Sequence, residues 1–103
     1  MAFASLTFTK VKPGVNPDEV KKVWDEGVTP ILKEQKGFLG NFLLATEQLD
    51  EGIAVSIWES KEDAEAIQTS GIYKQLVGKF AAFTAPPIER KIYIVNSELV
   101  FIK

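Results

Sequence analysis

The sequence predicts an α+β protein in which helices pack on an antiparallel sheet. Two observations indicate this class. Segments with alternating side chains lie at both ends of the chain and in its middle, and two segments with helical apolar stripes separate them. The chain of 103 residues is the size of one domain, so we expect residues 1–103 to form a single unit without internal repeats.

The first predicted element is a strand over Phe3–Val11. Its side chains alternate, so that one face carries Phe3, Ser5, Thr7 and Thr9 and the other carries Ala4, Leu6 and Phe8. β-Branched and aromatic residues in such a pattern are typical of strands. Lys12-Pro13-Gly14 then ends the strand.

A helix is predicted to follow, with Asn16 as its N-cap and Pro17 at its first position. Apolar residues then recur at helical spacing, at Val20, Val23, Trp24, Val28, Ile31 and Leu32. Pro30 falls inside this stripe, and because it lacks an amide hydrogen it predicts a kink rather than an end of the helix. We expect the helix to end at Lys36-Gly37.

Two strands are predicted next, over Phe38–Thr46 and Ile53–Trp58, with a turn at Asp50-Glu51-Gly52. A second helical region then begins at Ser60, and Asp63 stands at the capping-box position. Gly71 is expected to divide this region into two helices, whose apolar stripe comprises Ala64, Ile67, Ile72, Tyr73, Leu76, Val77, Phe80 and Phe83. Pro86-Pro87 is predicted to end the helical region.

Ile88–Val95 is predicted as the fourth strand, and Glu98–Ile102 as a short fifth strand. The order is therefore β-α-β-β-α-β with an extra C-terminal strand. This order is that of the ferredoxin-like plan, in which both helical regions cover the same face of an antiparallel sheet.

The second face of the predicted sheet is also apolar. The strands carry apolar side chains of both parities, at Leu43, Leu44, Ile53, Val55, Ile57, Ile92, Ile94 and Val95. Strands buried on both sides lose their clean alternation, and one helical layer covers only one face. We therefore expect a homodimer in which a second copy covers the other face. The alternative is a shift of strand parity at a bulge near Gly40 or Gly52.

Composition excludes several function classes. The net charge is −2, which gives no basic face for nucleic acid. The chain has no cysteine and no histidine, so thiolate catalysis, thiolate metal sites and the commonest general base are absent, and no metal site is expected. No apolar run reaches the roughly 18 residues of a membrane span, and the N-terminus does not read as a targeting signal. The expected location is the cytoplasm.

Three segments resemble the antibiotic-biosynthesis-monooxygenase domain: Glu34-Gln35-Lys36-Gly37-Phe38, Ser56-Ile57-Trp58-Glu59-Ser60 and Ser70-Gly71-Ile72-Tyr73. The resemblance covers nearly the whole chain. It implies a ferredoxin-like subunit that forms a dimeric α+β barrel from two sheets.

The tail, from Pro86-Pro87-Ile88 to Phe101-Ile102-Lys103, is most similar to the haem-degrading branch of that family. That branch uses an asparagine in the first strand, and a tryptophan and a haem-ligating histidine in the second helical region. Thr7, Ile67 and Val77 stand at those positions here. The resemblance therefore supports the fold and the place of the pocket but argues against haem degradation, and no cofactor is expected.

The candidate site is an apolar pocket between the sheet and both helical regions. We expect it to be lined by Thr7, Trp24, Trp58, Ile67, Tyr73, Val77 and Phe80. A pocket with few polar groups suits a planar aromatic ligand. The competing interpretation is that Ile67 and Val77 fill the space.

Several of these side chains have alternative roles. Core packing is favoured for Trp24 and Trp58. The hydroxyls of Ser5 and Thr7 need hydrogen-bond partners. We expect with equal weight that the partner is a ligand or that it is a neighbouring side chain or backbone group. Tyr73 could orient an oxyanion or simply pack. Arg90 is the only arginine; a carboxylate site is conceivable, but a surface charge is favoured.

Two functions remain open. The first is a cofactor-independent monooxygenase acting on an aromatic, polyketide-like small molecule, as the resemblance to the broader family implies. Such a reaction needs a dry pocket, a donor for the substrate anion, and either a base or an acidic substrate. The second is a non-catalytic dimer that binds a small molecule or has a regulatory role, which the lack of a histidine base favours.

Overall fold

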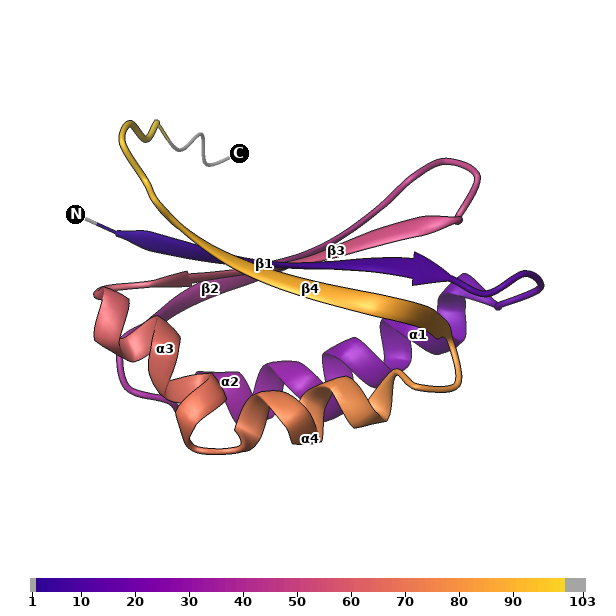
Figure 1. Ribbon diagram of the computed structural model, residues 1–103, viewed down its shortest axis with the longest axis horizontal. Coiled ribbons are helices and arrows are strands. Elements are labelled where there is room, and N and C mark those ends of the chain that lie inside the picture. The colour runs from indigo at the N-terminus through magenta and orange to yellow at the C-terminus, as the bar shows by residue number, and fades with distance from the viewer. Residues whose placement is uncertain (1, 100–103) are drawn as a thin grey trace.

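The computed structural model describes residues 2–99, which form a four-stranded antiparallel sheet with all helices on one face (Figure 1). The strand order is β2-β3-β1-β4. The strands are β1 (Phe3–Val11), β2 (Phe38–Ala45), β3 (Glu51–Trp58) and β4 (Thr84–Ile94). This arrangement confirms the predicted ferredoxin-like α+β plan. None of the helices in the described part of the chain is long and apolar enough to cross a membrane.

The helices form two rows on the same face of the sheet, and we call each row a helical layer. The first helical layer is continuous but irregular. It comprises α1 (Pro17–Val23), the π-helical turn η1 (Trp24–Val28) and α2 (Thr29–Lys33). The Asn16 side chain accepts a hydrogen bond from the Asp18 amide at 2.9 Å, which confirms the predicted N-cap. The Thr29 amide donates to the carbonyl of Trp24, five residues earlier. The irregularity expected at Pro30 is thus a π turn just before the proline, and the helix ends at Lys33, before the predicted Lys36-Gly37.

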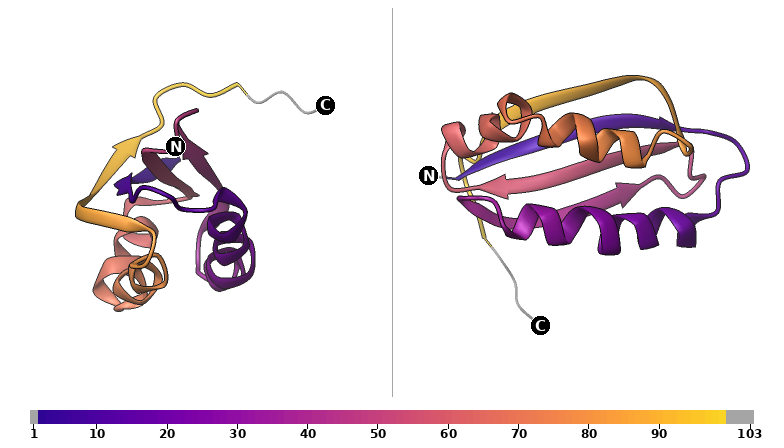
Figure 2. Two further views of the ribbon diagram at one scale, coloured as in Figure 1. Left: turned by 90° about the vertical axis from the view of Figure 1, so that its right-hand side faces the viewer. Right: turned by 90° about the horizontal axis from the view of Figure 1, so that it is seen from below.

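The second helical layer consists of α3 (Lys61–Thr69) and α4 (Ile72–Lys79). The Ser60 hydroxyl accepts from the Asp63 amide at 3.1 Å, as predicted for a capped start. Gly71 has a φ of 86° and divides the two helices, which is also as predicted. Figure 2 shows the two layers side by side below the sheet, with α3 and α4 under the β4 side and the first layer under the β2 side.

The C-terminal part of the chain differs from the expected bounds. The helical region ends at Lys79, and β4 begins at Thr84 with both prolines inside it. β4 is an edge strand, and its register with β1 shifts between Phe8 and Lys10, so the prolines lie where few ladder bonds are needed. Glu98 and Leu99 are not in a strand, and the rest of the predicted fifth strand lies outside the described residues.

Strand register divides the side chains between the two faces. Ser5 pairs with Ser56, and Thr7 pairs with Ala54 and Arg90. These residues line the cleft on the helical side, together with Thr9. The predicted parity of the first strand is therefore correct.

The opposite face of the sheet, which we call the open face, carries no helix (Figure 2). Register places on it the apolar or aromatic residues Ala4, Leu6, Phe8, Phe42, Leu44, Ile53, Val55, Ile57 and Tyr93, and the charged pair Glu89 and Lys91. Phe42, Leu44 and Tyr93 are each about half exposed. A register shift does occur between Phe38 and Gly40, where a bulge was the alternative expectation. It does not remove the apolar side chains from the open face.

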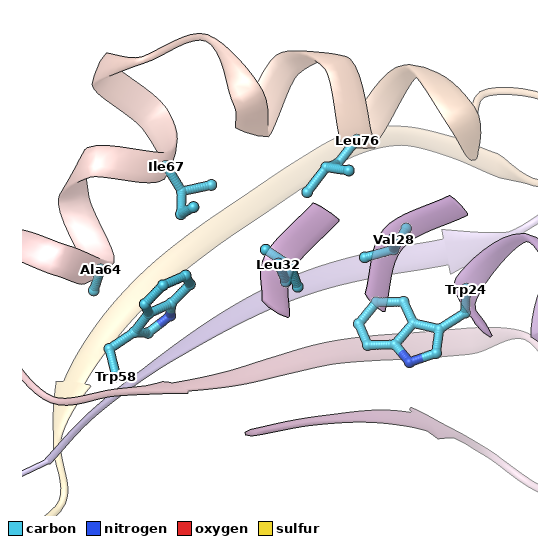
Figure 3. Close-up of a cluster of buried hydrophobic side chains, with 7 residues drawn as sticks. All are labelled: Trp24, Val28, Leu32, Trp58, Ala64, Ile67 and Leu76. Carbon is cyan, nitrogen blue, oxygen red and sulfur yellow. The ribbon is translucent and has the colours of Figure 1, made fainter. Parts of the chain in front are cut away.

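The core lies between the two helical layers and the sheet (Figure 3). It consists of Trp24, Val28, Leu32, Trp58, Ala64, Ile67 and Leu76. Both helical layers contribute one apolar stripe each, as amphipathic helices on a sheet must. The sheet and both layers therefore also frame the space beside this core.

Candidate functional site

A cleft of about 600 Å³ opens between the helix-facing side of the sheet and the two helical layers. Its floor is formed by β1 and β3, one wall by the first helical layer and β2, and the other by α4 and β4. Small-molecule sites in proteins commonly have volumes of about 300–1,000 Å³. The cleft was not filled by collapse of the side chains, which was the competing expectation.

All the side chains predicted for the pocket lie on this cleft: Thr7, Trp24, Trp58, Ile67, Tyr73, Val77 and Phe80. That they bind a ligand stays a prediction. Thr7, Ile67 and Val77, the three positions that depart from the haem-degrading pattern, are thus brought to one cavity.

Trp58 closes one end of the cleft and belongs to the core. It is 1% exposed, and its indole nitrogen donates to the Ser5 hydroxyl at 3.2 Å. The Phe38 ring packs against it edge-on, with 5.5 Å between centroids. Its N–H group is therefore already used, and Trp58 supplies an apolar wall rather than a donor for a ligand.

Trp24 lies at the start of the π turn and packs toward the other helical layer. It is 7% exposed, and its ring centroid lies 6.3 Å from that of Phe80 in a tilted arrangement. Figure 3 shows the nitrogen-bearing edge of Trp24 turned toward the sheet. Trp24 therefore joins the two walls and presents its polar edge toward the floor.

The hydroxyls of Ser5 and Thr7 differ in whether they have a hydrogen-bond partner. Ser5 is 5% exposed and is bonded to Trp58, so the alternative of a side-chain partner holds for it. Thr7 is half-buried on the floor, and within residues 2–99 no side-chain hydrogen bond joins it to a neighbour. Of these two hydroxyls, that of Thr7 remains available to a ligand.

Arg90 and Tyr73 form the charged wall of the cleft. The Arg90 guanidinium donates to the Ala64 carbonyl and to Gln68 Oε1, both at 2.8 Å, and lies 5.3 Å from the Tyr73 ring centroid. Burial lowers the pKa of Arg90 from its usual value, while Tyr73 and Glu65 act in the opposite direction. An arginine stays protonated in proteins, so this group is a cation at the cleft.

The favoured interpretation of Arg90 as a surface charge was therefore wrong. It is half-buried and held by α3. No carboxylate in the described part of the chain forms a salt bridge with it, so part of its donor fork is available. Strand parity contained a signal, because Arg90 pairs with Thr7 and thus faces the helices.

Asn41 and Thr29 are two further polar residues of the cleft that the sequence did not single out. The Asn41 side-chain nitrogen donates to the Thr29 hydroxyl at 3.0 Å and so links β2 to the first helical layer. A signal was available, because Asn41 is the lone polar side chain within the otherwise apolar β2.

Carboxylates are scarce at the cleft. Of the aspartates and glutamates in the described part of the chain, only Asp25 lines it, and Asp25 pairs with Lys21, which lines the cleft as well. Within residues 2–99, histidine, cysteine, aspartate and glutamate side chains form no group of three that could hold a metal. The described cleft therefore offers the Arg90 cation, the Lys21–Asp25 ion pair, hydroxyls and an amide.

A family comparison assigns the chain. The model of the family described as "Antibiotic biosynthesis monooxygenase" matches residues 1–79. The chain belongs to this family. No curated protein matches the sequence significantly.

Solved structures of antibiotic biosynthesis monooxygenases share the fold. A mutant of SnoaB, a cofactor-independent oxygenase from Streptomyces nogalater, matches with a TM-score of 0.75 and 14% identity over 95% of this chain and 96% of that chain. The ActVA-Orf6 monooxygenase of Streptomyces coelicolor, in complex with nanaomycin D, matches with a TM-score of 0.73 and 13% identity over 98% and 93% of the two chains. At these identities the likeness shows the fold alone.

Proposed function

We propose that this family member is a small cofactor-independent oxygenase that acts on an aromatic, polyketide-like small molecule in the helix–sheet cleft. The observation that carries this proposal is the Arg90–Tyr73 pair on the wall of an otherwise largely apolar cleft of about 600 Å³. Family membership supports it. So do the descriptions of SnoaB as a cofactor-independent oxygenase and of ActVA-Orf6 as bound to nanaomycin D.

Ground-state oxygen is a triplet, so a reaction without metal or flavin needs a substrate that gives up an electron easily. An enolate or phenolate does so. Its one-electron transfer to oxygen gives a radical pair, whose recombination forms a C–O bond. Loss of water then leaves a carbonyl, and an activated methylene plus O₂ becomes a ketone plus water. The protein must stabilise the anion and keep water out.

Arg90 can supply the anion stabilisation. Its guanidinium is oriented by Ala64 and Gln68 and half-shielded from water, where a charge-assisted hydrogen bond is stronger than in bulk solvent. The Tyr73 hydroxyl and the Thr7 hydroxyl are further donors at the same cleft. The substrate oxygen would lie against Arg90, and the aromatic rings against Trp24 and Phe80.

We expect the substrate to be acidic enough to lose its proton without the help of a protein base. Asp25, the carboxylate that lines the cleft, is paired with Lys21 and half exposed. Lowering the pKa of the bound substrate through Arg90 would then replace general-base catalysis, with the proton released to solvent.

The test uses anthrone, a tricyclic ketone with an acidic methylene. Wild-type protein should consume oxygen with anthrone and form the corresponding quinone faster than buffer does, without added metal or flavin. Arg90→Gln should lose most of this rate, roughly 10²-fold if the cation is an oxyanion partner. Lys74→Met, which removes an exposed cation beside Tyr73, should retain it. Equal rates with protein and with buffer, over a panel of such ketones, would exclude the oxygenase function.

The second candidate is a non-catalytic protein that binds a small molecule in the same cleft. The scarcity of carboxylates at the cleft favours it, because no unpaired acid lines the described walls as a base. Saturable quenching of tryptophan fluorescence by aromatic ketones, without oxygen consumption, would support this candidate over the oxygenase.

We further propose that the protein is a homodimer in which the open faces of two sheets pack together. The support is the apolar composition of that face, including the half-exposed Phe42, Leu44 and Tyr93. A contiguous apolar face of this kind is unusual on a monomer. Self-association buries it in a symmetric contact without a second gene product.

A further inference from the structure

The wall of the cleft opposite Arg90 carries one amide side chain, that of Asn41. It lies on β2, the strand at the other edge of the sheet from β4. Its register partner on β3 is Ser56, which in turn pairs with Ser5, so Asn41 stands on the helix-facing side. The side chain is half-buried and reaches across to Thr29.

The π turn determines where Thr29 lies. Thr29 follows Val28 directly, and its amide donates to the Trp24 carbonyl instead of to the carbonyl four residues back. The wide turn changes the phase of every later side chain by about one residue relative to an unbroken α-helix. In this phase the Thr29 hydroxyl faces β2 and accepts the Asn41 N–H at 3.0 Å.

This single bond leaves most of the hydrogen-bonding capacity of the pair unused. A carboxamide has two N–H donors and one oxygen acceptor, and a hydroxyl has its own proton. Within residues 2–99, the side-chain oxygen of Asn41 and the hydroxyl proton of Thr29 have no partner. Asn41 lines the cleft and is held there by its one hydrogen bond to Thr29, so its second N–H and its oxygen remain available to a ligand.

The distance to Arg90 limits which ligands can use both walls. Arg90 aligns with Thr7, Ala54 and Leu43 across the sheet, and Asn41 lies two residues along β2 from Leu43. Three strand spacings separate β4 from β2, which is roughly 14 Å between backbones. A fused ring system with an oxygen at each end is long enough to approach both walls, whereas a single ring would reach only one wall.

We propose that Asn41, oriented by Thr29, determines specificity by binding an oxygen at the end of the ligand that lies away from Arg90. This inference rests on the proposed function only in so far as the cleft binds an aromatic ligand, and it does not require turnover. Asn41 would accept from a ligand hydroxyl through its oxygen or donate to a ligand carbonyl through its second N–H. Ligands with oxygens at both ends are then preferred over ligands with an oxygen at one end.

The test compares two matched probes, 2,6-dihydroxyanthraquinone and 2-hydroxyanthraquinone, by quenching of tryptophan fluorescence. Wild-type protein should bind the dihydroxy compound about threefold to tenfold more tightly, the effect of one hydrogen bond. Asn41→Leu should abolish this preference while leaving the affinity for the monohydroxy compound within about twofold. Thr29→Val should reduce the preference, because the amide is no longer held. Gln35→Leu removes an amide that bonds to the Ile31 carbonyl outside the cleft, and it should change nothing.

A purely structural role of the Asn41–Thr29 hydrogen bond predicts a different result. Asn41→Leu would then lower the free energy of unfolding, and the ratio of the two affinities would stay at its wild-type value, which overturns the inference. Binding of both quinones by the wild type without any preference overturns it as well and leaves the cleft proposal standing. Binding of neither quinone overturns both proposals together.

Discussion

The indole nitrogen of Trp58 donates a hydrogen bond to the hydroxyl of Ser5 at 3.2 Å, inside the core at one end of the cleft. Both side chains are at most 5% exposed, so no solvent replaces this bond if it is lost. Ser5→Ala should therefore leave a buried N–H without an acceptor and lower the free energy of unfolding by about 1–3 kcal/mol. Urea unfolding followed by tryptophan fluorescence measures this loss.

Ser56→Ala is the matched control for this substitution. Ser56 pairs with Ser5 across the sheet and is 8% exposed, but it makes no side-chain hydrogen bond within the described residues. Ser56→Ala should therefore lower the free energy of unfolding by clearly less than Ser5→Ala does. Equal losses for the two variants would mean that the Trp58 bond contributes nothing specific.

Gly37→Ala should destabilise the protein more than Gly14→Ala. Both glycines have a positive φ, 79° and 78°, and alanine in that region costs about 1–2 kcal/mol. At Gly37 the added Cβ would also overlap Asp63 Oδ2 and lie 2.8 Å from the Asp63 Cβ, so the start of α3 must move. At Gly14 nothing lies within 4 Å. The two midpoints of urea unfolding give the comparison, and a smaller loss for Gly37→Ala would contradict it.

The sequence could predict the features that depend on near neighbours. The Asn16 and Ser60 caps bond to amides two and three residues away, and Gly71 breaks the helical region through its own backbone. Each is a local effect with a known residue preference. The β4 prolines were misjudged because a proline usually ends an element, whereas a register shift at a sheet edge tolerates it.

The polar groups of the cleft were harder to predict because they depend on contacts between distant elements. Arg90 is half-buried only because α3 offers it the Ala64 carbonyl and Gln68, 26 and 22 residues earlier. The Asn41–Thr29 hydrogen bond depends on the π turn, which changes the direction of the side chains that follow it. The spacing of the apolar residues does not predict this turn. The apolar walls, in contrast, follow from helix stripes that the sequence shows directly.

Haem should not be degraded by this protein. Val77 lines the cleft, and by the resemblance it stands where the haem-degrading branch is expected to have its ligand; the chain contains no histidine or cysteine to replace that ligand. Incubation of protein, haem and a reductant should leave the Soret band unchanged beyond the loss seen in a protein-free control. Steady loss of the band with release of iron would contradict this prediction.

Ile57→Lys should disrupt the proposed homodimer. Ile57 pairs with Ala4 and Gly40, which places it on the open face, away from the cleft. Between two packed sheets an unpaired ammonium would cost several kcal/mol, whereas on an exposed face of a monomer it would cost little. Native mass spectrometry should show a dimer for the wild type and a monomer or unfolded protein for the variant. Ala66→Lys, on the exposed side of α3, should remain dimeric. A wild-type monomer at micromolar concentration would exclude the dimer.

Thr7→Val should weaken ligand binding with little change in stability. Valine has nearly the shape of threonine, so the substitution removes a hydroxyl from the cleft floor while the space stays filled. Because Thr7 makes no side-chain hydrogen bond within residues 2–99, the fold loses little. A ligand oxygen held between this hydroxyl and Arg90, its register partner on β4, would lose one hydrogen bond, about 0.5–1.5 kcal/mol. Titration of 2-hydroxyanthraquinone against wild type and variant measures this difference. An unchanged dissociation constant with an unchanged unfolding midpoint would place the ligand away from the floor, and binding would then depend on the walls alone.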